Sequence, residues 1–569
     1  MSASSTPPPL QVVFCWHMHQ PYYKGAGRSD FHLPWVYLHG IKDYTDMAAH
    51  LENNPDAKAV VNFAPVLLEQ IDDYVEQLQA WLDRGILIRD PVLAALAGPG
   101  MPVDTKSRRA IIMACLRANE HRLINRFRHF EELAKLARHA LEHADTVPYL
   151  NDQFLADLLV WYHLAWIGEC TRVNDLRVRS LQAKGRGFST EDRQRLVELI
   201  WEVLSTLTPR YTTLAKKGQV ELSVTPYAHP IVPLLIEMDS AKEALPSINM
   251  PELENYPGGE ARSRWHIRKG IEVFEKHFGF RPRGCWPSEG AISGAAVKML
   301  EEEGFKWAAS GQQVLSNSLM TSSEQAHLPD NWVHTPYRLQ EGRLNLFFRD
   351  DGLSDLIGFT YGEWHADDAV GDLINHLVNI AEACKGNPQA VVSIIMDGEN
   401  AWEYYPNNGS YFLDAMYARI AEHPRLQLTT FSHVQKRSRR LAPKLGRLVS
   451  GSWVYGTFTT WIGDKDKNRA WDLLGQAKKD FDQALMTHDY SAERMEALER
   501  QLAICEGSDW FWWFGDYNPG ATVSDFEKLF RIQLSYLYEL LEIPTPDHLK
   551  RVFAVGSGDP SLGGVMIKN

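Results

Sequence analysis

An apolar run that ends abruptly in polar groups occupies Ala390-Val-Val-Ser-Ile-Ile-Met-Asp397-Gly-Glu399-Asn-Ala-Trp402-Glu403. The run is rich in β-branched residues, and acids, an amide and tryptophan follow it at once. This pattern is typical of a buried parallel strand that presents a polar site at its C-terminal tip. The sequence therefore predicts that Asp397 stands at the end of a strand, facing a site.

Seven further segments have the composition of short buried strands, and most are followed by polar or aromatic clusters. The eight segments are Leu10 to Trp16, Lys58 to Phe63, Val220 to Thr225, Gly284 to Trp286, Phe305 to Ala309, Asn345 to Arg349, Val391 to Met396 and Leu426 to Phe431. Helical patterns separate them. Seven or eight strands that alternate with helices favour a closed β/α barrel over an open sheet.

Two long regions have helical periodicity and almost no strand pattern. One covers residues 74 to 214, with Ser189 as a predicted N-cap, and we interpret it as a helical insertion over one rim of the barrel. The other follows residue 440 and contains three amphipathic segments. The sequence thus predicts a disordered tail over residues 1–9, a barrel over 10–440, and a helical C-terminal domain over 441–569 that contributes to the cleft.

Composition limits the classes of partner. A formal charge of −13 without any long Lys/Arg run argues against nucleic acid, and no segment approaches the length of a membrane span. The N-terminus lacks the pattern of a secretory signal, and six scattered cysteines resemble reduced core residues, so we expect a cytoplasmic protein. Eighteen tryptophans are enough to fill a core and also to line a groove for sugar rings.

A second carboxyl group occurs in the same setting as Asp397. The stretch Gly284-Cys-Trp286-Pro-Ser-Glu289-Gly places Glu289 beside a tryptophan just after a short apolar segment. Hydrolysis of a sugar acetal needs two carboxyl groups: one protonates the leaving oxygen and the other stabilises the oxocarbenium-like centre. Glu289 and Asp397 are the candidate pair. Burial and the charge of Glu289 are expected to raise the pKa of Asp397.

Five stretches, taken together, resemble the five sequence regions of glycoside hydrolase family 57, and most of all its amylopullulanase-like members. They are His17 to Pro21, Gly218 to Thr225, Gly284 to Glu289, Met396 to Asn400, and Asp509 to Trp513. The resemblance implies a (β/α)7 barrel, an incomplete form of the eightfold barrel, with helical insertions and a helical C-terminal domain. It also implies a retaining mechanism on α-glucans without a cofactor or catalytic metal.

Carried over position by position, the resemblance makes Glu289 the nucleophile and Asp397 the general acid/base. It also implies a set of substrate-binding residues: His17, His19, Gln20, Glu221, His229, Trp286, Trp402, Trp461, Asp509 and Trp510. The implied reaction cleaves α-1,4 bonds, or α-1,6 bonds, in an α-glucan. Water as acceptor gives amylase or amylopullulanase activity, and a second glucan gives 4-α-glucanotransferase or branching activity. The tryptophan cluster of residues 510 to 513 favours the amylopullulanase-like alternative.

Other interpretations stay open at this point. Glu399 and Glu403 are rival acids in the same stretch as Asp397, and Glu363 and His365 form another acid and imidazole pair. The alternate histidines His17 and His19 have a common metal-ligand spacing. They would support a metal-dependent hydrolase or deacetylase, with Asp397 and His229 completing the site. A glucan-binding protein without turnover would be expected to lack one of the two carboxyl groups, and this chain has both.

Overall fold

The computed structural model describes residues 8–27, 30–322, 331–438 and 441–558. The predicted disordered tail lies almost entirely outside these residues. Each of the eight predicted strands is present, with ends shifted by a few residues. The strands are β1 (Leu10–Met18), β2 (Ala59–Phe63), β3 (Val220–Val224), β4 (Gly284–Cys285), β5 (Trp307–Ser310), β7 (Asn345–Phe348), β8 (Val391–Asp397) and β9 (Leu426–Leu428).

Seven of these strands form a parallel, nearly closed barrel in the order β7-β5-β4-β3-β2-β1-β8. The two ends of this path meet where the backbone N–H of Asp350, just after β7, donates to the carbonyl oxygen of Ser393 in β8 at 2.8 Å. The eighth strand, β9, pairs with the first half of β1. A short pair, β6 (Arg338–Leu339) and β10 (Lys444–Leu445), lies apart. The predicted (β/α)7 barrel is confirmed.

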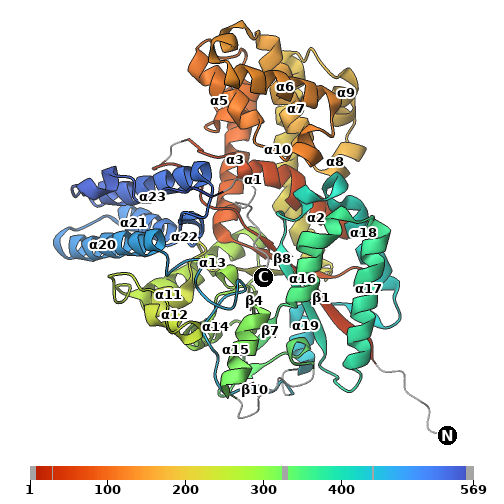
Figure 1. The fold of residues 1–569 in the computed structure, drawn as a ribbon, viewed down its shortest axis with the longest axis vertical. Helices are drawn as coiled ribbons and strands as arrows, with labels where there is room; N and C mark the ends of the chain where they lie inside the picture. Colours follow the sequence, from red (N-terminus) through yellow and green to blue (C-terminus); the bar gives the residue numbers. More distant parts are fainter. Residues whose placement is uncertain (1–7, 28–29, 323–330, 439–440, 559–569) are drawn as a thin grey trace.

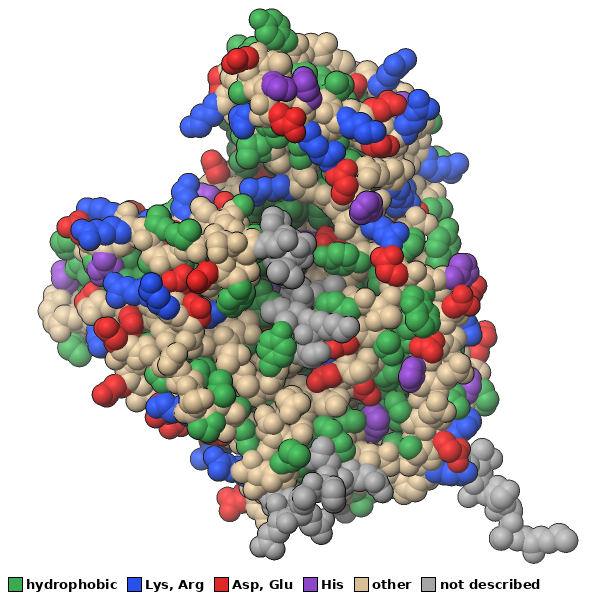
Figure 2. All heavy atoms as spheres, in the orientation of Figure 1, with side chains coloured by type: hydrophobic (Ala, Val, Ile, Leu, Met, Phe, Trp, Pro, Cys, Tyr) green, Lys and Arg blue, Asp and Glu red, His purple; other side chains and the backbone are tan. Residues whose placement is uncertain are grey.

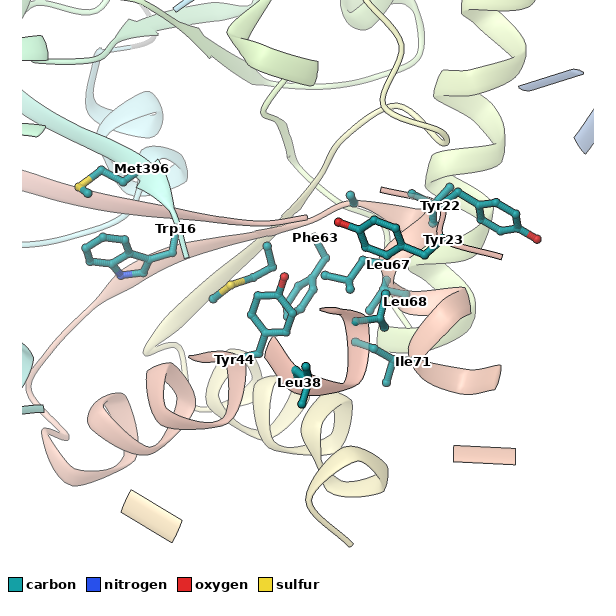
Figure 3. Packing of buried hydrophobic residues seen from close by; sticks show 14 of the residues in the cluster. Trp16, Tyr22, Tyr23, Leu38, Tyr44, Phe63, Leu67, Leu68, Ile71 and Met396 are labelled. Carbon is teal, nitrogen blue, oxygen red and sulfur yellow. The ribbon is translucent and has the colours of Figure 1, made fainter. Parts of the chain in front are cut away.

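The strands are buried on both faces, which explains why their sequences are nearly continuous apolar runs. All nine residues of β1 are buried, and β8 is buried up to Asp397. The barrel packs against the helices around it: Figure 3 shows Leu38 and Tyr44 lying beside Phe63 and Leu67. One cluster of buried hydrophobic side chains runs from Leu10 to Ala554, so the barrel and the surrounding helices share a core.

The helices between β1 and β3 begin with α1 (Trp35–His39), a π-helical turn η1 (Gly40–Tyr44) and α2 (Thr45–Asn53). The insertion between β2 and β3 contains α3 (Pro65–Arg84), α4 (Pro91–Ala97), α5 (Thr105–Cys115), α6 (Arg128–Glu142), α7 (Asp152–Trp166), α8 (Glu169–Asn174), α9 (Leu176–Lys184) and α10 (Thr190–Lys216). Ser189 caps α10 as predicted, since its side chain accepts from the backbone N–H of Asp192. The Asp192 carboxylate in turn accepts from the backbone N–H of Ser189, which completes a capping box.

The later helices divide into two groups. Those connecting the remaining barrel strands are α11 (Val232–Ile236), α12 (Ala241–Ala244), α13 (Gly259–Phe278), α14 (Gly294–Glu302), α15 (Gln312–Ser322), α16 (Asp351–Asp355), α17 (Ala366–Ala383), α18 (Ser410–Glu422) and α19 (Phe431–Ser438). The C-terminal helices are α20 (Lys465–Thr487), α21 (Ala492–Cys505), α22 (Asp509–Trp513) and α23 (Gly520–Leu540). No helix in the described part of the chain is long and apolar enough to cross a membrane.

The insertion and the C-terminal helices project from two sides of the barrel. In Figure 1 the helices α5 to α9 stand at the top, α20 to α23 lie at the left, α11 to α15 lie below them, and α16 to α19 lie at the right. The expected boundaries at residues 10, 440 and 441 remain predictions. The six cysteines are free thiols, and only Cys170 is not fully buried.

A buried ion cluster holds the C-terminal helices to the barrel. Arg262, on α13, donates to both carboxylate oxygens of Glu506, just after α21, and His266 lies 2.7 Å from the same carboxylate. Tyr256 donates a further hydrogen bond to Glu506 at 2.7 Å. Although burial opposes it, the charge of Arg262 and the bond with His266 lower the pKa of Glu506 to about 2. Glu506 is therefore ionised, and both of its carboxylate oxygens accept hydrogen bonds.

We expect Glu506→Gln to reduce the free energy of unfolding at pH 7 by about 3 kcal/mol, because it removes the buried anion of Arg262 and leaves only the more exposed Glu499 to pair with that guanidinium. The wild-type contribution is fully present above the ordinary glutamate pKa of about 4.3 and declines as the pH falls towards about 2. Denaturant unfolding of wild type and variant between pH 7 and pH 3 measures both effects. A variant whose stability falls just as steeply with acid as that of wild type would contradict this assignment.

Candidate active site

A cleft of about 510 Å³ opens where the barrel, the insertion and the C-terminal helices meet. The barrel contributes side chains that follow β1, β4 and β8, so the cleft lies at the C-terminal ends of the parallel strands, where a β/α barrel places its site. The surface is hollowed in this region (Figure 2). Its wall includes His17, His19, Gln20, Trp35, His39, Glu289, Arg349, Asp397, Glu399, Asn400, Glu403, Trp453, Asp509, Trp512 and Trp513.

Glu289 is presented by the short loop after β4 in an unusual backbone conformation. Its φ is 57° and its ψ 24°, in the left-handed region that costs a non-glycine residue energy and that is concentrated at functional sites. The indole N–H of Trp453 donates to Glu289 Oε2 at 2.9 Å, and the backbone N–H of Trp453 donates to the carbonyl oxygen of Glu289 at 3.1 Å. Trp453 thus fixes both the side chain and the backbone of Glu289.

Asp397 is the last residue of β8, as the sequence predicts, and it pairs in register with His17 of β1. Asn400 donates to its Oδ2 at 2.7 Å. The hydrogen-bond donor comes from the turn directly after the strand, so the acid and its partner belong to one local unit. Asp397 and Glu289 line the same cleft from strands that are not neighbours.

The two carboxyl groups influence each other's ionisation. Burial raises the pKa of both. The charge of Asp397 raises the pKa of Glu289 further, to well above the ordinary value, whereas the bond from Asn400 and the charges of His19 and Arg349 counteract the rise at Asp397. Burial acts on Asp397 as expected from the sequence. The repulsion between the two groups adds to the rise at Glu289.

A chain of hydrogen bonds fixes His17 and His229 as neutral rings. His17 Nδ1 lies 2.7 Å from Asn62 Oδ1, His17 Nε2 lies 3.1 Å from His229 Nε2, and His229 Nδ1 lies 2.8 Å from Ser508 Oγ. The amide oxygen can only accept, so His17 carries its proton on Nδ1 and accepts from His229 Nε2–H. Burial and the neighbouring imidazoles lower the pKa of His17 to about 3 and that of His229 well below its ordinary value.

His19 and Asp509 form the second polar pair of the site. His19 Nε2 lies 2.8 Å from Asp509 Oδ1, and the His19 ring stacks on the His229 ring with centroids 3.8 Å apart. His19 Nδ1 is buried in the cleft wall and has no hydrogen-bond partner among the described residues. That nitrogen is therefore available to a bound molecule.

The three histidines also form a group that could hold a metal ion, since one ring nitrogen of each lies within 4.8 Å of the others. Neutral imidazoles are good ligands for zinc, so the residues fit the metal hypothesis in type. Asp397, the fourth ligand of that hypothesis, does not belong to this group. Moreover, the nitrogens of His17 and His229 that face one another already share a hydrogen bond. A metal ion would have to displace that bond.

The rival acids differ in position. Glu399 and Glu403 line the cleft, and burial raises the pKa of each; the charge of Asp397 raises that of Glu399 further. Gln20 donates to Glu399 Oε1 at 3.3 Å, while Glu399 Oε2 is buried without a partner among the described residues. Glu363 and His365 lie on the exposed surface and do not line the cleft.

Four of the predicted substrate-binding tryptophans lie beneath the cleft rather than in its wall. Trp286, Trp402, Trp461 and Trp510 are each at most 1% exposed. Trp286 packs edge-on against Trp453, Trp402 donates its indole N–H to the carbonyl oxygen of Gly398, and Trp510 donates to that of Ile504. These tryptophans support the loops that carry the polar groups, and their bulk explains why the sequence places them beside the site.

Glu221 also departs from the expectation. It is the second residue of β3, so its side chain lies towards the N-terminal end of the barrel and not at the cleft. Its carboxylate accepts from the indole N–H of Trp307 at 2.7 Å and from the backbone N–H of Ser432 at 2.8 Å. Because these donors come from β5 and α19, Glu221 joins elements across the barrel interior.

Trp453, Arg349, Trp512 and Trp513 line the cleft but were not predicted. The Arg349 guanidinium lies 5.5 Å from the Trp453 ring and is held by Asp351 and Asp355 at 2.7 Å each. Arg349 thereby supports the tryptophan that bonds Glu289. The sequence contained an indication of Arg349 and of Trp453. Arg349 ends the expected strand at 345–349, and Trp453 lies near the start of the aromatic connector after the barrel.

Comparison with known proteins identifies one family and several solved structures with a similar fold. The model of glycosyl hydrolase family 57 matches residues 13–445. No match was found among curated proteins. Three solved structures are similar over nearly their whole length. A family 57 branching enzyme from Thermococcus kodakaraensis is 16% identical, with 93% of this chain and 90% of that chain covered and a TM-score of 0.54. A branching enzyme from Pyrococcus horikoshii is 15% identical (coverage 97% and 99%, TM-score 0.55), and an α-amylase from Thermotoga maritima is 14% identical (coverage 94% and 97%, TM-score 0.53). At this identity they support the fold alone.

The Trp453 indole N–H offers a direct reporter of Glu289, because it bonds that carboxylate. In a pH titration followed by NMR of the indole groups, we expect the Trp453 signal to shift at a pH above the ordinary glutamate value. In Asp397→Asn the midpoint should move to lower pH, because the charge that raises the pKa of Glu289 is gone. The Trp453→Phe variant assigns the signal. An unchanged midpoint would mean that the two carboxyl groups are not coupled.

Proposed function

The chain belongs to glycosyl hydrolase family 57, and from this membership we propose that it cleaves α-glucosidic bonds of α-glucans with retention, through a glycosyl ester on Glu289. The observation that carries the proposal is the pair of partly buried carboxyl groups in one cleft, each presented by the C-terminal end of a strand and coupled through charge. A retaining reaction needs one nucleophilic carboxylate and one proton-donating carboxyl group about 5 to 5.5 Å apart.

In the first step Glu289 attacks the anomeric carbon. The bond from C1 to a Glu289 oxygen forms as the bond from C1 to the glycosidic oxygen breaks, and the proton of Asp397 passes to that oxygen. The indole N–H of Trp453 holds the attacking carboxylate in place, and Asn400 holds the acid. In the second step an acceptor hydroxyl loses its proton to Asp397 and bonds to C1 while the ester to Glu289 breaks.

Burial raises the pKa of both carboxyl groups, and the charge of Asp397 raises that of Glu289 further, so the pair favours holding one proton. A bound sugar determines where that proton lies, because positive charge that develops at C1 stabilises ionised Glu289, and the glycosidic oxygen draws the proton towards Asp397. Substrate binding therefore favours the protonation state that the reaction needs.

The remaining polar groups suit the sugar bound between the two carboxyl groups. His19 Nδ1 and Glu399 Oε2 are buried polar atoms without protein partners, and both residues line the cleft. Sugar hydroxyls can donate and accept, so they would satisfy both atoms. Trp512 and Trp513 offer aromatic faces in the wall for sugar rings. The burial of Trp510 removes one argument for an amylopullulanase-like preference, so hydrolysis, glucan transfer and branching all remain compatible with this mechanism.

The proposal predicts that Glu289→Gln and Asp397→Asn lower turnover of maltoheptaose, amylose or pullulan by about 10²- to 10⁴-fold. Product analysis by chromatography measures both the loss and the wild-type products. Glu363→Gln is the matched control, because it removes an acid outside the cleft and should behave as wild type.

The same assay in buffer with EDTA separates this proposal from the metal hypothesis. Full activity in EDTA together with two inactive carboxyl variants supports the two-carboxyl reaction. Activity that disappears with EDTA and returns with Zn²⁺ would instead implicate His17, His19 and His229 as metal ligands. A wild-type protein that alters no glucan under either condition would refute the proposed function.

A further inference from the structure

The cleft continues beyond Asp397 along a wall that the proposed reaction does not yet use. Glu399 follows Asp397, and burial together with the charges of Asp397 and Asp43 raises its pKa. Next along this wall come Glu403 and His39, whose groups also interact. The acid of a retaining enzyme must reach the glycosidic oxygen, which stays with the leaving sugar and later with the acceptor. Because Glu399 interacts with Asp397, this wall adjoins the acid that would activate an acceptor.

A helix with a π-helical turn builds the wall. The segment runs through α1, η1 and α2 without interruption, and the π turn begins at Gly40, directly after His39. Such turns are rare and frequently mark functional sites. A side chain at Gly40 would come within 2.5 Å of Leu204 on α10, so the turn packs tightly against the insertion. Trp35 and His39, four residues apart, share the face that lines the cleft.

His39 is held in one tautomer with its second nitrogen directed to the cleft. Its Nδ1 lies 2.7 Å from Asp43 Oδ2, and Lys42 donates to Asp43 Oδ1 at 2.5 Å. Asp43 is fully buried; Lys42 balances its charge, and His39 donates to its second oxygen. The carboxylate accepts the Nδ1 proton of His39 and leaves Nε2 as an acceptor. No intramolecular bond is found for that nitrogen in the described part of the chain, and His39 lines the cleft.

Trp166 supplies an unused donor beside His39. It is 2% exposed, it lines the cleft, and its indole N–H has no hydrogen-bond partner among the described residues. The His39 ring meets the Trp166 ring edge-on with centroids 5.5 Å apart, and the Trp35 ring lies 5.7 Å from that of Trp166. Lys42 Nζ lies 5.3 Å from the Trp166 ring, so the ion pair behind the wall also supports the tryptophan. An acceptor on a molecule bound in the cleft would satisfy this N–H.

We propose that Trp35, His39 and Trp166 form an acceptor subsite that binds a glucosyl unit of a second α-glucan, which makes transfer favourable over hydrolysis. This inference rests on the function proposed above. Trp35 offers a stacking face, His39 Nε2 accepts from one sugar hydroxyl, and Trp166 Nε1 donates to another. A neighbouring hydroxyl of the same sugar then attacks C1 of the glycosyl ester, gives its proton to Asp397 and releases Glu289. An ordered sugar at this position excludes the water that would otherwise attack.

The test uses α-maltosyl fluoride as donor and maltose as acceptor, because fluoride leaves without occupying the acceptor side. The ratio of transfer product to hydrolysis product is measured by chromatography over a range of maltose concentrations. We expect Trp166→Phe, which removes only the N–H and part of the ring, to lower this ratio about tenfold, and His39→Gln to lower it similarly. Trp201→Phe is the matched control: its indole N–H also lacks a partner, but Trp201 does not line the cleft.

The outcomes separate this inference from the proposed function. A wild-type protein that releases no fluoride and alters no glucan refutes the proposed function itself. A wild-type protein that releases fluoride but forms no transfer product at any maltose concentration overturns the acceptor subsite and leaves the proposed reaction intact. An unchanged ratio in both Trp166→Phe and His39→Gln also overturns the subsite. A tenfold fall in both variants, with Trp201→Phe at the wild-type ratio, supports it.

Discussion

The parallel pairing of β1 with β8 is the constraint on which the site depends. Its register places His17 opposite Asp397, so the first and the seventh strands of the barrel end together. His17 then joins His229, from the segment after β3, through their facing nitrogens, and His229 joins Ser508 of the C-terminal region. One register thereby aligns an acid, two imidazoles and a hydroxyl group that are hundreds of residues apart in the sequence.

The C-terminal helices complete this arrangement, and a single charged group joins them to it. Glu506 binds Arg262 and His266 of the barrel, and the next residues of the chain supply Ser508 to His229 and Asp509 to His19. The ion cluster is fully buried, so its geometry is strongly constrained. The position of the polar groups in the cleft is thus set by an ion pair outside the cleft.

The sequence predicted the fold more completely than the site. Strand composition identified all eight strands of the main sheet, because burial on both faces imposes apolar runs that are easy to recognise. The polar residues at strand ends, Asp397 and His17, were placed correctly beside the cleft for the same reason. The positions of the tryptophan side chains were harder to predict. A large aromatic residue next to a site can face the ligand or pack beneath the loop, and the sequence does not distinguish these two arrangements. Trp286 and Trp510 support loops, whereas Trp453 and Trp512 line the wall.

Glu221 and the wall of Trp35, His39 and Trp166 show a second limit. Glu221 has the right residue type but lies near the start of its strand, which places it at the other end of the barrel. His39 and Trp166 reach the cleft wall through contacts between helices far apart in the chain, and neither has a local motif. Local pattern identifies residues that a strand presents, but it does not identify those that helix packing brings together.

The bond from Trp453 to Glu289 has a consequence for how the protein matures during synthesis. Trp453 belongs to the connector after the last barrel strand, and Asp509, the partner of His19, is made later still. A nascent chain that has folded only its barrel therefore holds Glu289 without its indole donor and His19 without its carboxylate. The ribosome must therefore release residues up to Asp509 before the polar groups of the cleft have all of these partners.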